Sequence, residues 1–155
     1  MSLRPVLSRL AIAVLLTACQ SSTASTVEGP VQIAIQQSLT SQTSAAGTFQ
    51  LSGAVSDAGS TTEELTFGGP LDRPPVPVTF RRTLVGAHGT MVLSGSASLS
   101  FTSPTAGVLA GSWKVEQATG KYASLAGAGT LTGSADFSAT PATASIAYSG
   151  NVKEQ

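Results

Sequence analysis

The segment MVLSGSASLSF, from Met91 to Phe101, alternates between two kinds of side chain. Apolar or small residues occupy its odd-numbered positions, and serines occupy every even-numbered position from Ser94 to Ser100. Successive side chains of a β-strand point to opposite faces, so a period of two predicts a strand with one buried face and one solvated face. Strands are most often about five or six residues long, and the greater length here favours a strand that runs obliquely around a barrel.

The same period recurs from Pro30 onward, in place of the 3.6-residue period of a helix. Glycine, proline, aspartate and serine, which favour turns, separate the apolar runs. We therefore predict an all-β domain of eight antiparallel strands. The expected strands contain residues 31–36, 49–55, 65–67, 76–84, 91–101, 109–115, 131–137 and 144–152.

A short Leu-x-Gly motif occurs on four of these strands. Glycine inside a strand usually marks a bend, a bulge or the close approach of another backbone. Repetition at like positions predicts a tightly coiled sheet that closes into a β-barrel and so has no exposed edge; a β-sandwich is the alternative. The four copies are Leu51-Ser-Gly53, Leu93-Ser-Gly95, Leu109-Ala-Gly111 and Leu131-Thr-Gly133.

The composition fits one domain with an unusually uncharged surface. The chain has 155 residues, of which 10% are charged, compared with about 25% in a typical globular domain. Eight basic and eight acidic side chains give a formal net charge of zero. Because the basic residues form no patch that could contact phosphates, we expect no nucleic-acid partner.

Residues 1–18 have the parts of a bacterial signal peptide. Arg4 and Arg9 supply the positive region, and LAIAVLL at residues 10–16 supplies the apolar region. A helix over residues 10–18 would be about 14 Å long, too short to cross a hydrocarbon core of about 30 Å. The segment Leu16-Thr-Ala-Cys19 resembles the lipobox of bacterial lipoproteins; the alternative is an ordinary secretory signal followed by an incidental cysteine.

The lipobox resemblance implies that Cys19, the only cysteine, carries acyl chains such as palmitate that hold the protein on a lipid bilayer. Loss of residues 1–18 removes two arginines and leaves a net charge of −2. Residues 19–29 are then a lipidated flexible tether, and residues 30–155 are the barrel domain. The expected location is the cell envelope. Gln20, in place of aspartate, favours the periplasmic face of the outer membrane if the source has two membranes.

Few residues suit catalysis or metal binding. His88, the only histidine, lies in the segment GAHG, which predicts a solvated hairpin turn, so we expect neither a nucleophilic triad nor a metal site. Adjacent residues on a strand face opposite ways, so Glu63 and Glu64 do not form a catalytic pair. By the same rule, one of Arg81 and Arg82 faces the barrel interior, where a lone guanidinium needs a partner or an anionic ligand. We expect no cofactor.

Residues 111–133 contain a tryptophan-bearing strand, then ATGKYASLAG at residues 118–127 and a glycine-rich strand. This pattern resembles the superfamily of allene oxide cyclases, dirigent proteins and related bacterial secreted proteins. The resemblance implies a hollow antiparallel barrel of eight strands, with Tyr122 on a short helical turn as a plug at one end. The segment lacks the Gly-Lys-Ser/Thr of a phosphate loop. Trp113 and Tyr122, with Arg81 and Arg82, are the candidate ligand-pocket residues.

These features predict a membrane-anchored lipoprotein, without enzymatic activity, whose barrel binds a small apolar ligand. One alternative, implied by the barrel resemblance, is a cyclase or isomerase that confines a hydrophobic substrate in the lumen. A surface adhesin or assembly subunit is another. Residues 68–77 contain four prolines, which predict a stiff loop over one rim of the barrel. We interpret this loop as a plain connection between strands; a lid is the alternative.

Overall fold

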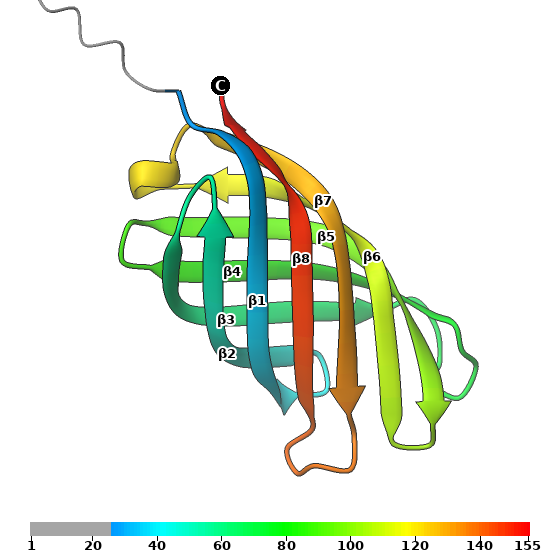
Figure 1. Ribbon diagram of the computed structural model, residues 1–155. Coiled ribbons are helices and arrows are strands. Elements are labelled where there is room, and N and C mark those ends of the chain that lie inside the picture. Colours follow the sequence, from blue (N-terminus) through cyan, green and yellow to red (C-terminus); the bar gives the residue numbers. More distant parts are fainter. Residues whose placement is uncertain (1–25) are drawn as a thin grey trace, which may run out of the picture.

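The computed structural model describes residues 26–155, so the predicted signal peptide, Cys19 and most of the predicted tether lie outside the described residues. The described chain confirms the all-β prediction, and each of the eight predicted strands overlaps an observed one. Within residues 26–155, a single 3-10 helix accompanies them (Figure 1). The elements are β1 (Glu28–Ser41), β2 (Ser44–Gly53), β3 (Asp57–Phe67), β4 (Val76–Gly86), β5 (Thr90–Ser103), β6 (Ala106–Ala118), η1 (Gly120–Tyr122), β7 (Leu125–Asp136) and β8 (Thr143–Glu154).

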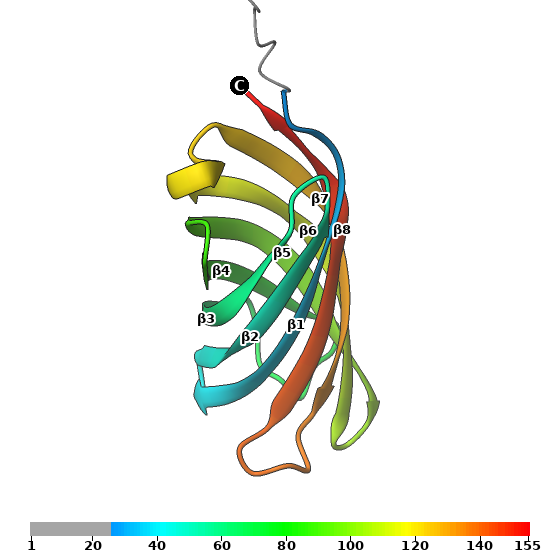
Figure 2. The same ribbon diagram turned by 60° about the vertical axis from the view of Figure 1, so that its left-hand side comes forward.

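The strands form a closed antiparallel barrel, which confirms the barrel over the sandwich. Each strand pairs with the next one along the chain, and β8 pairs with β1 to close the sheet (Figures 1 and 2). The closing seam runs from the pair Glu28 and Lys153 to the pair Ser38 and Thr143. Because Glu28 and Gly29 join this seam, β1 begins two residues before the expected start of the domain.

The Leu-x-Gly motif marks places where neighbouring backbones come very close. A Cβ atom added at Gly111 would collide with the carbonyl oxygen of Ser96 and lie 2.6 Å from the Cα of Ala97. One added at Gly95 would collide with the carbonyl oxygen of Ser112 and lie 2.6 Å from the ring of Phe80. At these two positions a side chain does not fit, which explains why the coiled sheet needs glycine there.

Alternate residues of the strands point inward and fill most of the barrel. The main apolar core includes Ile33, Ile35, Leu84 and Leu93, all of which are almost completely buried. A second, smaller cluster of buried residues consists of Val76, Val78 and Leu99, with Phe67, Phe101 and Phe137 packed against it.

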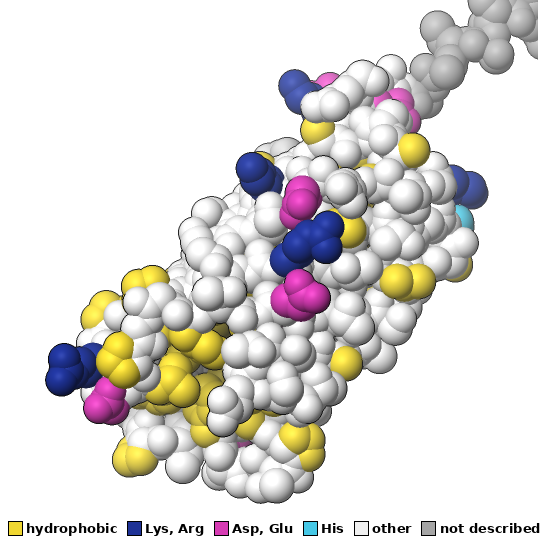
Figure 3. Space-filling model, turned by 180° about the vertical axis from the view of Figure 1, so that it is seen from behind, with side chains coloured by type: hydrophobic (Ala, Val, Ile, Leu, Met, Phe, Trp, Pro, Cys, Tyr) yellow, Lys and Arg dark blue, Asp and Glu magenta, His cyan; other side chains and the backbone are white. Residues whose placement is uncertain are grey.

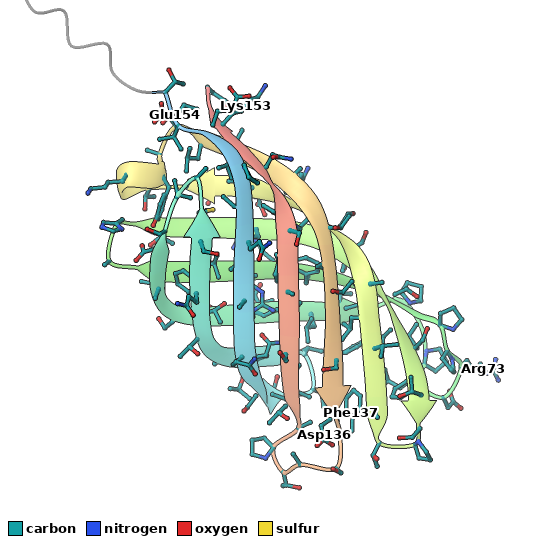
Figure 4. The ribbon with its side chains drawn as sticks, viewed as in Figure 1. Arg73, Asp136, Phe137, Lys153 and Glu154 are labelled. Carbon is teal, nitrogen blue, oxygen red and sulfur yellow. The ribbon has the colours of Figure 1, made fainter. Side chains whose placement is uncertain are left out.

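Because consecutive strands are antiparallel, the connections fall alternately at two ends of the barrel. We call one the closed end; there β1 begins, β8 ends and η1 lies (Figure 1). We call the other the open end; Figure 4 shows Asp136 and Phe137 there, and Lys153 and Glu154 at the closed end. The closed end has connections 54–56, 87–89 and 119–124, and the open end has connections 42–43, 68–75, 104–105 and 137–142.

Candidate functional site

A cavity of about 70 Å³ enters the barrel from the open end. Figure 3 shows it as a hollow lined by hydrophobic side chains, at the end of the molecule opposite the grey N-terminal segment. Residues from every strand except β2, and from connection 137–142, form its walls, because their inward side chains stop short of filling the lumen there. The apolar lining includes Leu39, Phe67, Leu99, Ala135, Phe137 and Ile146.

Three buried polar residues, Gln37, Glu63 and Tyr148, also line the cavity, and the exposed Thr143 is a fourth polar lining residue. The three buried residues are each at least nine-tenths buried, and all three bond to Arg82 or to each other. Thr61 completes the group through a hydrogen bond from Arg82. We refer to these five residues, Gln37, Thr61, Glu63, Arg82 and Tyr148, as the polar cluster.

The centre of the polar cluster is an ion pair between Glu63 and Arg82. These residues lie directly opposite each other on β3 and β4, so the strand register itself brings them together. Arg82 Nη2 lies 2.6 Å from Glu63 Oε1, and the two side chains are 0% and 3% exposed. A buried charge is stable only when it is paired, and the structure therefore supplies Arg82 with an internal partner.

Hydrogen bonds hold the remaining polar atoms of Arg82. Its Nη1 donates to Gln37 Oε1 at 2.8 Å and to Thr61 Oγ1 at 3.2 Å, and its Nε donates to Tyr148 Oη at 2.9 Å. Gln37 Nε2 in turn donates to Glu63 Oε2 at 2.7 Å. The Nη2 atom faces Glu63 closely but without the angle of a hydrogen bond, so it is held by charge attraction.

Tyr148 links the polar cluster to the aromatic core. Its ring makes edge contacts with Phe80 and Trp113, each at 6.1 Å between ring centroids. Burial is the main cause that raises the pKa of Tyr148 to about 12; the charge of Glu63 adds to the rise, and Arg82 opposes it. The phenol is therefore protonated near neutral pH.

The structure separates the four residues predicted as pocket candidates. Arg82 belongs to the polar cluster, whereas Arg81 faces outward and pairs with Glu116 at 3.3 Å. Trp113 is buried in the core and donates from Nε1 to the Thr130 and Ser149 carbonyl oxygens. Tyr122 lies at the closed end, and none of the four is among the residues that line the cavity.

Tyr122 fills the closed end from the short helix η1, where its ring joins the main core. Its hydroxyl donates to Asp57 Oδ2 at 2.6 Å, and the amides of Ala58, Ala87 and His88 donate to the same carboxylate. The hydrogen bond from Tyr122, followed by those amides, holds the pKa of Asp57 well below its ordinary value against the opposing effect of burial. Burial and then Asp57 raise the pKa of Tyr122.

His88 lies in the predicted hairpin turn with its side chain 44% exposed, and its Nδ1 is 3.7 Å from Asp57 Oδ2. Within residues 26–155, no three His, Cys, Asp or Glu side chains are grouped so that they could hold a metal ion. In the same range, the structure contains no helix with the length and apolar character needed to span a membrane. Protein-family models, curated proteins and solved structures were each compared with the chain, and none matched.

Sequence reasoning singled out Arg82 but gave no role to Gln37, Thr61, Glu63 or Tyr148. The alternation of β1 carries the signal for one of them, because Ile33 and Ile35 are followed at the same spacing by Gln37. In β4, Val78 and Phe80 are followed in the same way by Arg82. Continuing each apolar face by two residues would have placed both polar side chains inside the barrel.

Proposed function

We propose that this protein is a lipid-anchored component of the bacterial cell envelope whose barrel binds a small apolar ligand at the open end. The observation that carries the binding half of the proposal is the apolar cavity with a polar floor, a combination typical of small-molecule sites. The sequence Leu16-Thr-Ala-Cys19, with its resemblance to a lipobox, supports the anchoring half. The resemblance of residues 111–133 to a superfamily of hollow barrels is consistent with a ligand in the lumen.

The size of the cavity limits what it encloses. Pockets that enclose a whole drug-sized ligand have volumes of about 300–1,000 Å³. With about 70 Å³, the cavity accepts only the leading end of a molecule, and the remainder lies among the apolar side chains of the mouth. A slender apolar molecule that enters by one end fits this shape best.

The anchoring half is tested by Cys19→Ser in the full chain, expressed in a bacterium that makes lipoproteins and fed an alkyne analogue of palmitate. The unchanged protein should take up the label and sediment with membranes, as should the control variant Ser21→Ala. The Cys19→Ser variant should remain unlabelled and either unprocessed or soluble. Membrane association of a processed, unlabelled Cys19→Ser protein would contradict the proposal.

The binding half is tested with N-phenyl-1-naphthylamine, a neutral dye that fluoresces in apolar sites. Ala144 lines the cavity, and a leucine there should occupy the space that the dye enters. Ala147 lies on the same strand with its side chain exposed, so Ala147→Leu is the matched control. We expect Ala144→Leu to weaken dye binding at least tenfold and Ala147→Leu to leave it unchanged. Equal binding by both variants would place the dye outside the cavity.

A cyclase or isomerase is the second candidate, favoured by the presence of the ionisable Glu63 at the floor of an apolar cavity. Two observations make it the weaker one. Glu63 is already engaged by Arg82 and Gln37, and the cavity is too small to enclose a substrate that must fold into a ring. A Glu63-dependent cyclisation of an added polyunsaturated epoxide by the purified protein would reverse this order.

A further inference from the structure

We propose that the cavity at the open end binds the hydroxyl end of a neutral, otherwise apolar alcohol, with the hydroxyl held by Glu63, Gln37 and Tyr148. This inference rests on the proposed function for the existence of a ligand. It adds the chemical group that the ligand carries at the end that enters the barrel.

The floor of the cavity is electrically balanced. The buried charged side chains at this floor are Glu63 and Arg82, and they are paired with each other, whereas the buried carboxylate of Asp57 lies at the closed end. A carboxylate or ammonium group would lose its hydration on entering and find no unpaired counter-charge. The group that reaches the floor is therefore neutral.

The floor has unused hydrogen-bonding capacity of both kinds. Tyr148 Oη accepts from Arg82 Nε, and within the described residues its own proton has no hydrogen-bond acceptor. The carboxylate of Glu63 can accept about four hydrogen bonds, of which one comes from Gln37 while Oε1 faces Arg82. Because its pKa is raised to about 12, Tyr148 remains a donor at neutral pH.

A hydroxyl uses this capacity better than other small neutral groups. It can donate to Glu63 and at the same time accept from Tyr148 or from the second amide proton of Gln37. An ether or a ketone only accepts, and a methyl group does neither, so each would cover the floor and leave polar atoms unsatisfied.

The volume of the cavity agrees with a group of this size. One water occupies about 30 Å³ of liquid, so 70 Å³ holds roughly two groups as large as a water. That is enough for a hydroxyl and its first carbon or two. The rest of the molecule lies between the apolar side chains that line the mouth, among them Leu39, Phe67 and Phe137.

The test measures displacement of N-phenyl-1-naphthylamine from the purified barrel by three probes. They are 1-octanol, its isomer heptyl methyl ether, which accepts but cannot donate, and octanoate, which is charged. We expect 1-octanol to displace the dye at a concentration at least tenfold lower than either of the others. The tryptophan fluorescence of Trp113, which contacts Tyr148, provides a second signal of occupancy.

Two double variants test whether the polar cluster causes the preference for 1-octanol over the ether. Glu63→Leu/Arg82→Leu replaces the inner ion pair with apolar side chains, and Arg81→Leu/Glu116→Leu does the same to the exposed pair on the outside. The inner variant should bind the dye and lose most of the preference for 1-octanol, whereas the outer variant should keep it. If the inner variant does not fold, as judged by circular dichroism, Tyr148→Phe serves instead and should reduce the preference at least threefold.

Several outcomes overturn the inference. If the ether displaces the dye at the same concentration as 1-octanol, the site does not recognise a hydroxyl. The inference would then be wrong, although the proposed apolar site would remain. If octanoate binds most tightly, the ligand is a carboxylate and not an alcohol. If the inner variant or Tyr148→Phe still prefers 1-octanol to the ether, the polar cluster does not bind the hydroxyl. Failure of the dye and all three probes to bind would contradict the proposed function as well.

Discussion

The two ends of the barrel each have an aspartate that accepts hydrogen bonds, but the two carboxylates connect very different parts of the chain. At the closed end, Asp57 binds groups 30, 31 and 65 residues away and so joins the start of β3 to connections 87–89 and 119–124. At the open end, Asp136 binds Ser138, two residues further along its own connection. Contacts that are distant in sequence break only when much of the fold opens, whereas local ones do not resist local opening. The Asp57 carboxylate therefore depends on the global structure, whereas the Asp136 carboxylate braces its own connection.

The polar cluster lies where the filled part of the lumen meets the cavity, and it carries the largest expected effect. Either Glu63→Leu or Arg82→Leu alone leaves one buried charge without its partner, which should lower the free energy of unfolding by about 3–5 kcal/mol. The double variant, with both charges removed, should recover most of this loss. Urea unfolding followed by circular dichroism measures all three proteins.

The exposed pair on the outside of the same strand gives the control for that comparison. Arg81→Leu should cost no more than about 1 kcal/mol, because Arg81 and Glu116 are both substantially solvated. If Arg81→Leu and Arg82→Leu lower the free energy of unfolding by similar amounts, Arg82 and Glu63 are not a buried ion pair in solution.

The next largest effect compares aromatic residues at the two ends. Tyr122→Ala removes a buried ring and its hydrogen bond to Asp57, and should lower the free energy of unfolding by about 3 kcal/mol. Phe137→Ala removes a partly exposed ring from the rim of the cavity and should cost about 1 kcal/mol or less. Thermal unfolding of both variants tests the difference, and an equal loss at both ends would contradict the asymmetry.

Acidification should weaken the closed end more than the open end. The folded-state pKa of Asp57 is below its ordinary value of 3.8, so its contribution to stability is present above about pH 4 and is lost as the pH falls further. Asp57→Asn should cost about 1 kcal/mol at pH 7 and make the urea midpoint fall less steeply between pH 4 and pH 2. Asp136→Asn is the open-end control and should change the acid slope less.

Tyr122 should make the stability fall as the pH rises, in the alkaline range. Its folded-state pKa is raised above 10.0, so the stabilisation is complete below about pH 10 and is lost as the pH rises beyond it. Tyr122→Phe should therefore flatten the alkaline limb of the stability profile. An unchanged alkaline limb would mean that the hydroxyl of Tyr122 is not bound to Asp57 in solution.

The smallest effect is expected in connection 68–75. Leu71 is 47% exposed there, so Leu71→Ser should change the free energy of unfolding by no more than about 0.5 kcal/mol. A loss of several kcal/mol, measured by urea unfolding, would mean that this connection packs against the open end as a fixed part of the fold.

The strand pattern could be predicted from sequence wherever the inward residues are apolar. β3 is the instructive exception, because only Leu65 and Phe67 at its end were recognised although the strand begins at Asp57. The inward residues of the missed part include Thr61 and Glu63, whose polarity removes the alternation. The apolar alternation of β3 is thus interrupted at the positions where the strand contributes residues to the polar cluster.

The site could be predicted only in part. The rule that adjacent strand residues face opposite ways correctly required one of Arg81 and Arg82 to point inward. The identity of its partner depends on the register between β3 and β4, which pairs Glu63 with Arg82 and Glu64 with Arg81. Register is set by the connection between the strands and by the whole barrel, so the sequence of either strand alone does not contain it.

The described chain begins and ends at the closed end, so the proposed tether leaves the barrel at the end opposite the cavity. From Cys19 to Val27 the chain reaches at most about 30 Å, while the 14 residues of β1, tilted as barrel strands are, extend about 35 Å along the barrel axis. If Cys19 is anchored in a bilayer as proposed, the tether is too short for the barrel to stand inverted with its mouth pressed onto the lipid surface. When the barrel stands upright on its tether, its mouth faces away from the membrane, and the ligand would arrive from the aqueous space or from a surface on its far side.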